Sequence, residues 1–405
     1  MRPRGVSEHD FAAALAAFRS AVGAGWVFTS AEDVALYRDA YSPAWGASDE
    51  RHASAAVAPQ SVEEVQAVVR AANRYRVPLY PISTGRNLGY GGSAPNLSGS
   101  VVLDLKRMNR VIEVDDRRHF AIAEPGVSYF DLYRHIRARG LQAWLDVPGP
   151  SWGSLVGNAL DHGVGDTWGI YRNHFSAHCG LEVVLPDGTL VRTGIGAPPE
   201  AKTWGEYPYG FGPSIDGLFA QGNCGVVTKM GFWLMPAPES YFTGTIAVLR
   251  RADILALVDL VNYFEHQGIG GEPIYGSPAG AEQTHRDYQK LVADGSFPAD
   301  AALDAFAAAR GKAYWSVKLQ FYGPREVVRT QWQAATRLAV ERIPGAAFAN
   351  ARLLELPLSE DDCATVDPVA FGIPSLATFA LTARSSRHPQ GSDGHLFFAH
   401  YSEIR

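Results

Sequence analysis

The chain has 405 residues, 46% of them hydrophobic and 19% charged, and it carries a formal net charge of −6. This length predicts two domains, and the acidic balance argues against a nucleic-acid-binding surface. Three widely spaced cysteines, Cys179, Cys224 and Cys363, indicate neither a disulfide framework nor a metal site. The sequence holds no secretory leader and no run of eighteen apolar residues, so we expect a cytoplasmic protein that does not enter a membrane.

The first hundred residues predict a β-α-β arrangement. Apolar spacing indicates a helix over 8–22. A capping box, with Ser61 as N-cap and Glu64 at the third helical position, begins a second helix. Apolar runs at 77–82 and 101–105 then predict two strands.

The segment between these strands, residues 83–93, holds four glycines, at 85, 89, 91 and 92. Glycine tolerates positive φ and close backbone approach, and successive N–H groups can form a nest for an anion such as a pyrophosphate. The sequence contains neither a P-loop nor a dinucleotide fingerprint. From the glycines alone, an ordinary flexible loop is an equally good interpretation.

Two further glycine-rich segments follow, separated by strand and helix patterns. Residues 111–114 and 120–123 predict a strand pair, and a capped helix is expected over 128–140. The second segment, over 149–169, is expected to be a glycine-rich loop, and the third glycine cluster covers 205–231.

Pro236-Ala-Pro238 marks a predicted domain boundary, because longer amphipathic helices follow it. The expected helices are at 251–266, 298–312 and 324–342, and the expected strands at 241–248 and 314–321. We therefore predict an α+β chain with a nucleotide-binding domain and a substrate-covering domain. The predicted parts are an N-terminal arm over 1–54, the nucleotide-binding domain over 55–240 and the substrate-covering domain over 241–405.

Several blocks of this sequence match one family jointly, over the chain from about residue 55 to the end. The blocks are Thr84–Gly92, Gly99–Leu105, Glu124–Val127, Trp152–Ala159, Gly163–Gly165, Tyr209–Pro213, Ile215–Phe219 and Asn223–Pro236. Together they resemble the vanillyl-alcohol oxidase / 4-cresol methylhydroxylase family of FAD enzymes. The resemblance implies an FAD-binding domain of two α+β subdomains and an α+β cap domain over the flavin ring.

FAD is therefore the expected cofactor, with the first glycine-rich segment at its pyrophosphate. The residues expected to bind it are Ser83, Thr84, Gly85, Arg86, Asn87, Leu88, Gly89, Pro148, Gly153, Ser154, Gly157, Asn158, Gly163, Gly165, Gly222, Gly225, Val226 and Val227. In the oxidase branch of the family a histidine is linked covalently to the flavin, and His395 resembles it. The alternative for His395 is a surface histidine on an edge strand.

The chemistry implied is hydride transfer from the benzylic carbon of a para-substituted phenol to flavin N5, driven by deprotonation of the phenol. Tyr90 matches a tyrosine that helps to hold the phenolate; the alternative is a tyrosine that packs the loop. Alternation along 394–400 places Phe397 with His395, so Phe397 is expected to line the pocket. Val164 is a second candidate for the pocket wall, with the core as the alternative.

Two positions depart from the family pattern. Gly149 stands where a carboxylate near flavin N5 is expected, and Asp166 stands where a tyrosine contacts the phenol. Asp166 is a candidate for the missing carboxylate, although its charge would repel a phenolate. His174 matches a family histidine near the flavin, but two residues are inserted just before it, and we expect His174 and His178 to be structural or solvent-exposed and not catalytic.

Three readings of function stay open at this point. The first is oxidation of a para-substituted phenol or related aromatic alcohol. The second is a flavin oxidoreductase with a different alcohol or amine substrate, and the third is a flavin-binding protein without turnover. The family also implies molecular oxygen or a cytochrome c as electron acceptor, a homodimer, and a longer C-terminus, so we expect a truncated chain.

Overall fold

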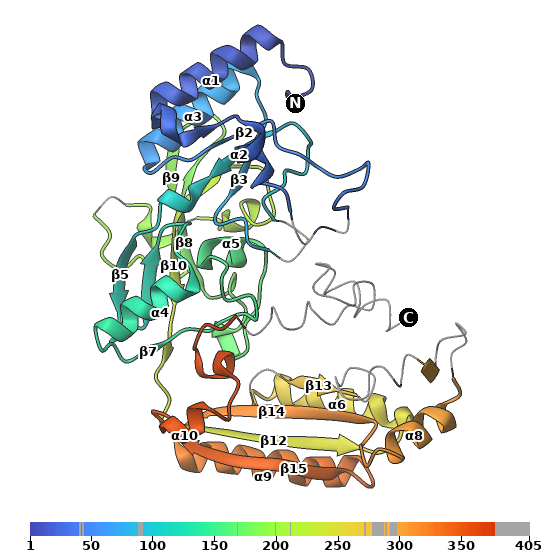
Figure 1. Ribbon diagram of the computed structural model, residues 1–405. Helices are drawn as coiled ribbons and strands as arrows, with labels where there is room; N and C mark the ends of the chain where they lie inside the picture. The colour runs from blue at the N-terminus through green and yellow to red at the C-terminus, as the bar shows by residue number, and fades with distance from the viewer. Residues whose placement is uncertain are drawn as a thin grey trace. The chain divides into compact units, whose positions relative to one another are not determined.

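The computed structural model describes residues 1–39, 42, 44–87, 92–167, 169–198, 200–210, 212–270, 273–277, 287, 290–291 and 298–376 (Figure 1). Its helices and strands bear out the predicted α+β class. The chain divides into two compact units. Unit 1 comprises Met1–Gly165, Asn173–Pro236 and the chain from Pro368, and unit 2 comprises Asp166–Arg172 and Ala237–Asp367.

Unit 1 begins with a four-stranded sheet in the order β1-β2-β4-β3. The strands are β1 (Val27–Phe28), β2 (Ala55–Val57), β3 (Leu79–Ile82) and β4 (Val101–Asp104), and the last three are parallel. Helices α1 (Glu8–Val22) and α3 (Val62–Tyr75) share one core with this sheet, and α2 (Ala31–Ala35) follows β1. Ser61 caps α3 as predicted, since its hydroxyl accepts from the Glu64 N–H.

A second sheet of unit 1 has the order β5-β6-β10-β8-β9, and all its neighbouring strands are antiparallel. Its strands are β5 (Val111–Asp115), β6 (Phe120–Ala123), β8 (His178–Val184), β9 (Leu190–Arg192) and β10 (Val226–Trp233). Helix α4 (Tyr129–Ala138) carries the predicted cap, with Ser128 and Asp131 bonded reciprocally. Two further short strands, β7 (Ala143–Trp144) and β11 (Met235–Pro236), pair with each other in antiparallel orientation.

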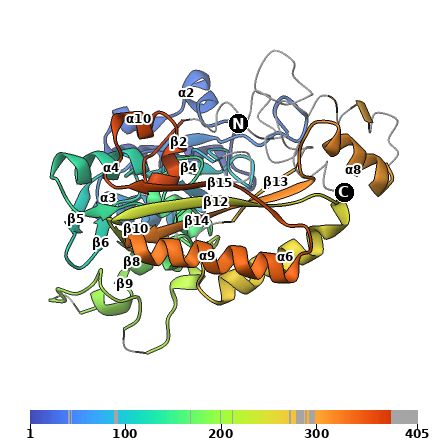
Figure 2. The same ribbon diagram turned by 90° about the horizontal axis from the view of Figure 1, so that it is seen from below.

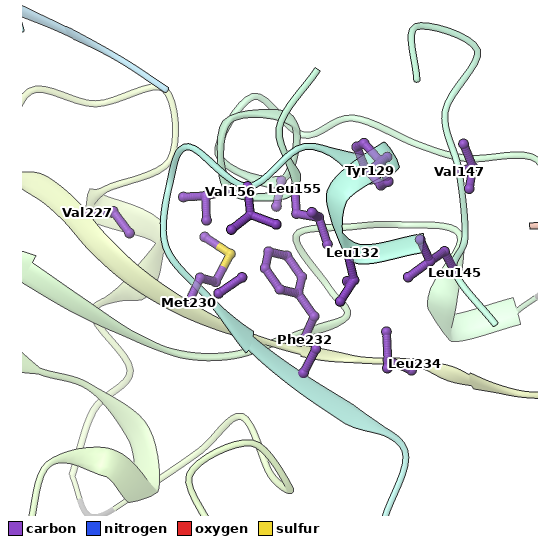
Figure 3. Close-up of a cluster of buried hydrophobic side chains, with 14 of the residues drawn as sticks. Tyr129, Leu132, Leu145, Val147, Leu155, Val156, Val227, Met230, Phe232 and Leu234 are labelled. Carbon is purple, nitrogen blue, oxygen red and sulfur yellow. The ribbon is translucent and has the colours of Figure 1, made fainter. Parts of the chain in front are cut away.

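The core of this second layer collects side chains from β10, α4 and the chain after β7 (Figure 3). Met230 and Phe232 project from β10 toward Leu132 of α4 and toward Leu155. Leu155 belongs to α5 (Leu155–Leu160), a helix inside the segment predicted to be a glycine-rich loop. The loop prediction is wrong there because Ser154 caps the helix and Leu155, Val156 and Ala159 are buried.

Unit 2 is a four-stranded antiparallel sheet in the order β13-β14-β12-β15. The strands are β12 (Ser240–Val248), β13 (Ile274–Gly276), β14 (Trp315–Gly323) and β15 (Ala347–Glu355). Figure 2 shows α6 (Ile254–His266) and α9 (Arg325–Arg342) along one face of this sheet, where they share a core with it. The remaining helices of this unit are α8 (Asp300–Ala308) and α10 (Glu360–Cys363).

The elements predicted for unit 2 agree with the structure to within a few residues at each end, because the period of the apolar pattern is clear in each, whereas β13, β15 and α10 were not predicted. After unit 2 the chain returns to unit 1 through a short 3₁₀ turn, Pro368–Phe371. Val369 packs into the core of Figure 3, and the Phe371 ring lies 6.2 Å from that of Trp144. None of the described helices is long and apolar enough to cross a bilayer.

Candidate cofactor and substrate site

The first glycine-rich segment leaves β3 at Ile82 and turns at Gly85, which has a φ of +65°. The Ser93 hydroxyl donates to the Gly85 carbonyl oxygen at 2.9 Å and so closes the far side of the turn. A Cβ at Gly85 would lie 2.5 Å from Ser93 Oγ, so this turn requires glycine. Leu88, Gly89 and Tyr90 lie outside the described residues, and their expected roles stay predictions.

The second segment lies directly against the first. A Cβ at Gly157 would be 2.2 Å from Ser83 Oγ, so the Ser83 side chain packs in the space that a side chain at position 157 would need. Two side chains of the first segment reach across as well. The exposed Arg86 guanidinium donates to the Trp152 carbonyl at 3.5 Å, and the Asn87 amide donates to Asp161 at 2.8 Å.

Gly163 and Gly165 are crowded by protein atoms of their own unit. A Cβ at Gly163 would lie 2.3 Å from the Asn158 side chain, and one at Gly165 would lie 1.3 Å from Asp146 Oδ1. Glycine is therefore needed at both positions for packing alone. That their backbones also meet a flavin stays a prediction.

Next to Gly163 and Gly165, buried polar side chains form a network of hydrogen bonds. His174 Nε2 lies 3.1 Å from Asp146 Oδ1, and the Tyr129 hydroxyl lies 3.0 Å from His174 Nδ1 and 3.2 Å from Asn158 Oδ1. Nδ1 also contacts the Asn158 amide. Burial, with a contribution from Asp146, raises the pKa of Tyr129 well above its usual value, so the phenol stays protonated and donates. Asn158, predicted to bind FAD, thus uses its side chain to connect helix α5 with Tyr129 and His174.

A second buried pair joins His178 to Asp216. Nε2 of His178 lies 2.8 Å from Asp216 Oδ2, and its ring stacks on Phe175 with 4.4 Å between centroids. Both His178 and His174 are engaged in buried contacts, so neither is solvent-exposed, and the structural alternative is favoured for each. Sequence reasoning overlooked both Asp146 and Asp216. For Asp146 a signal was available, because it is a single acidic residue within the apolar stretch Trp144–Val147.

The third segment, Gly222–Val227, leads into β10. The side chains of Val226 and Val227 are buried in two separate apolar cores, so only the backbone here is available to a cofactor. A Cβ at Gly222 would lie 2.3 Å from the Leu218 carbonyl, and one at Gly225 would lie 2.5 Å from Val183.

Around the second segment, the Pro148 carbonyl accepts from the Ser151 hydroxyl, while a Cβ at Gly153 would meet only Pro150 O, at 3.4 Å.

Of the expected substrate residues, Val164 and Asp166 are described. Val164 is 52% exposed, which rules out the core alternative and leaves it available to a ligand. Asp166 belongs to unit 2, where its carbonyl accepts from Gln320 Nε2 at 3.2 Å and from the Tyr322 hydroxyl at 3.5 Å. His395 and Phe397 lie outside the described residues.

The paired segments Ser83–Asn87 and Gly153–Gly157 fit an elongated phosphate-bearing group such as FAD. Side-chain atoms of Ser93 and Ser83 fill the space that a Cβ would need at Gly85 and Gly157, and the exposed Arg86 supplies positive charge beside the first segment. Backbone N–H groups in such turns bind phosphate oxygens without side-chain bulk. Among the described residues, no group of three or more His, Cys, Asp or Glu side chains is arranged to hold a metal ion.

Comparison with known proteins identifies relatives along the whole chain. Residues 53–194 match a family model described as an FAD binding domain. The chain is 32% identical over 413 residues to the flavoprotein subunit of 4-cresol dehydrogenase (hydroxylating) from Pseudomonas putida, covering 100% of this chain and 75% of that protein. It is 35% identical to the 1'-carboxy-chondrochloren decarboxylase of Chondromyces crocatus over 70% of this chain and half of that protein.

The fold is similar to that of a solved oxidase. The structure of 4-ethylphenol oxidase from Gulosibacter chungangensis, in complex with isoeugenol, superposes with a TM-score of 0.77 at 34% sequence identity. The similarity covers 93% of this chain and 72% of that one. It therefore extends well beyond the cofactor-binding segment.

Proposed function

Because the chain belongs to the vanillyl-alcohol oxidase / 4-cresol methylhydroxylase family of FAD-dependent oxidoreductases, we propose that it removes a hydride from the benzylic carbon of a para-substituted phenol or related aromatic alcohol. The observation that carries this proposal is the full-length similarity to 4-cresol dehydrogenase. FAD, when bound, supplies the hydride acceptor. Every other task falls to residues of this chain.

The first task is to hold the cofactor. We assign the pyrophosphate to the backbone of Ser83–Asn87, with the charge of Arg86 beside it, and the flavin end to Pro148, to Gly153–Asn158 and to Gly163–Gly165. The close packing of the Ser83 side chain on Gly157 supports this assignment, because it brings the two segments together. His395 is the proposed covalent tether, and its test is whether yellow colour stays with acid-precipitated protein and is lost in His395→Ala.

The second task is to take the phenolic proton. Asp166 is the proposed base in place of the carboxylate that Gly149 lacks. The phenol O–H bond breaks, its electron pair stays on the phenolate oxygen, and the proton passes to the Asp166 carboxylate. Tyr90 would donate a hydrogen bond to that oxygen, and Val164 and Phe397 would line the ring pocket.

The alternative is a different oxidised substrate, such as another alcohol or an amine. Asp166 favours it, because a carboxylate attracts a hydrogen-bond donor or a cation on the substrate, whereas it repels a phenolate. The similarity to a decarboxylase over 70% of this chain supports it independently. A flavoprotein without turnover is the remaining reading, and any measurable rate excludes it.

The test is anaerobic mixing of the flavoprotein with 4-ethylphenol, 4-methoxybenzyl alcohol or benzylamine, followed by visible absorbance. Bleaching by 4-ethylphenol supports the proposal, and bleaching by benzylamine alone overturns it in favour of the alternative. Asp166→Asn is expected to slow bleaching by the phenol about 100-fold, the usual scale for a lost general base. Readmitting oxygen or adding cytochrome c then identifies the electron acceptor.

A further inference from the structure

The face of the unit 2 sheet that points away from α6 and α9 is polar but largely covered. Along β14, Val317, Leu319 and Phe321 alternate into the helix-covered core, so Lys318, Gln320 and Tyr322 point to the opposite face. On an antiparallel sheet such a polar face is commonly exposed to solvent. Here Gln320 is 0% exposed and Tyr322 is 7% exposed. We call Lys318, Gln320, Tyr322 and their cross-strand neighbour Tyr241 the polar face.

Gln320 is fixed at both ends of its amide. Its Oε1 accepts from the Tyr241 hydroxyl at 2.8 Å, and its Nε2 donates to the Asp166 carbonyl at 3.2 Å. The Tyr322 hydroxyl donates to the same carbonyl. These bonds hold the start of the segment Asp166–Arg172 on the polar face. Asp166 directly follows Gly165, the last residue of the proposed flavin loop, in the sequence.

Lys318 is the cation of this face. Its side chain is partly buried, and in the described part of the chain no carboxylate lies within ion-pair distance of its ammonium. Burial lowers the pKa of Lys318, while Asp367 and Asp166 act in the opposite direction from farther away. A half-buried ammonium without a close counter-ion is costly unless an anion completes its surroundings.

We propose that Lys318 binds the deprotonated ring hydroxyl of the aromatic substrate. This assignment rests on the proposed function and adds a specificity-determining residue to it. Once Asp166 holds the phenolic proton it is neutral, so the Lys318 ammonium and the phenolate oxygen attract each other without opposition from that carboxylate. A ring hydroxyl that cannot ionise gains nothing from Lys318.

The binding test uses 4-nitrophenol, whose phenolate is yellow and whose neutral form is not. Wild-type protein is expected to enrich the yellow form on binding. Lys318→Met is expected to raise the Kd at least tenfold and to bind the neutral form, whereas Lys318→Arg retains most of the affinity. Lys312→Met, which changes an exposed lysine of the same unit, is the matched control and is expected to behave as wild type.

The kinetic test compares 4-ethylphenol with 4-methoxybenzyl alcohol, which has no ionisable ring hydroxyl. Lys318→Met should slow flavin reduction by the phenol at least tenfold and leave the methoxy substrate within twofold. If phenols reduce both proteins equally fast, the proposed function stands and the role of Lys318 is wrong. If no phenol reduces or binds the wild type, the phenol function fails, and the Lys318 role with it.

A folding defect is recognised separately. It would lower FAD content and slow both substrates alike, and Lys318→Arg would not restore the phenol rate. That pattern would also overturn the proposal, because it would make Lys318 structural.

Discussion

The imidazole of His174 lies 3.1 Å from the carboxylate of Asp146, Nε2 to Oδ1, with both side chains less than a tenth exposed. An ionised carboxylate only accepts hydrogen bonds, so Nε2 carries the proton at this contact. The other ring nitrogen faces Asn158 and Tyr129. One histidine thus connects the chain after β7, helix α4 and helix α5.

We expect His174→Ala to lower the free energy of unfolding by about 2–3 kcal/mol, because it removes a buried charge-assisted hydrogen bond. It should also weaken FAD retention, since Asn158 of helix α5 loses its contact with the His174 ring. Urea unfolding with fluorescence and absorbance detection measures both. His9→Ala, an exposed change on α1, is the control and should shift stability by less than about 0.5 kcal/mol. Equal effects from the two variants would contradict the role given to the network.

Gly165 is predicted to be intolerant of any side chain. A Cβ there would lie 1.3 Å from Asp146 Oδ1, so Gly165→Ala has to push apart a packed carboxylate and loop. We expect a loss of about 3 kcal/mol or more, in the range of severe overpacking. Gly153→Ala is the matched change, with its Cβ at an ordinary 3.4 Å from Pro150 O, and should cost less than about 1 kcal/mol. Thermal unfolding of both variants decides the point.

The ion pair between Arg38 and Glu50 is expected to make the stability of the fold sensitive to acid. The hydrogen bond from Arg38 lowers the pKa of Glu50 from 4.5 to about 2, against desolvation and with help from the Gly46 N–H. Because the folded pKa is depressed, this carboxylate stabilises the fold above pH 4.5, and that stabilisation is lost as pH falls from 4.5 towards 2. Glu50→Gln should remove about 2 kcal/mol at neutral pH and flatten that part of the stability curve. Urea titrations at stepped pH measure it, and an unchanged acid slope would refute the prediction.

The cysteines are predicted to differ in reactivity. Burial raises the pKa of Cys179 to about 12, while Cys224 and Cys363 are exposed. The thiolate is the reactive form. In native protein, two cysteine thiols should therefore react rapidly with a colorimetric disulfide reagent, and the third should react only on unfolding. Cys224→Ser and Cys363→Ser should each remove one fast thiol. A fast third equivalent in native protein would contradict the assignment.

Local patterns predicted many of the helices and strands, because caps and apolar periods act over a few residues. Ser61 with Glu64 and the strand at 314–321 are examples. Helix α5 was missed since Gly157 and Asn158 are poor helix formers, and the burial of Leu155 and Val156 outweighs that preference. The FAD family was recognised from the blocks of sequence, and the comparisons confirm it.

Long-range relationships were not predictable in the same way. Ser83 meets Gly157 across 74 positions, which no local spacing encodes. Asp146 and His174 pair across 28 positions, and the segment Asp166–Arg172 joins unit 2 although its neighbours on both sides belong to unit 1. Polar pairs inside a core depend on tertiary packing, so a sequence alone can mark their members only as isolated acids or histidines among apolar residues.

The return of the chain to unit 1 at Pro368 has a consequence for biosynthesis. Val369 completes a core whose other members come from residues 121–234, yet the ribosome makes all of unit 2 in between. A nascent chain therefore exposes an unfinished apolar surface in unit 1 until residue 369 has emerged. Such a surface attracts chaperones and promotes aggregation, so expression of this protein should depend on how quickly translation passes through unit 2.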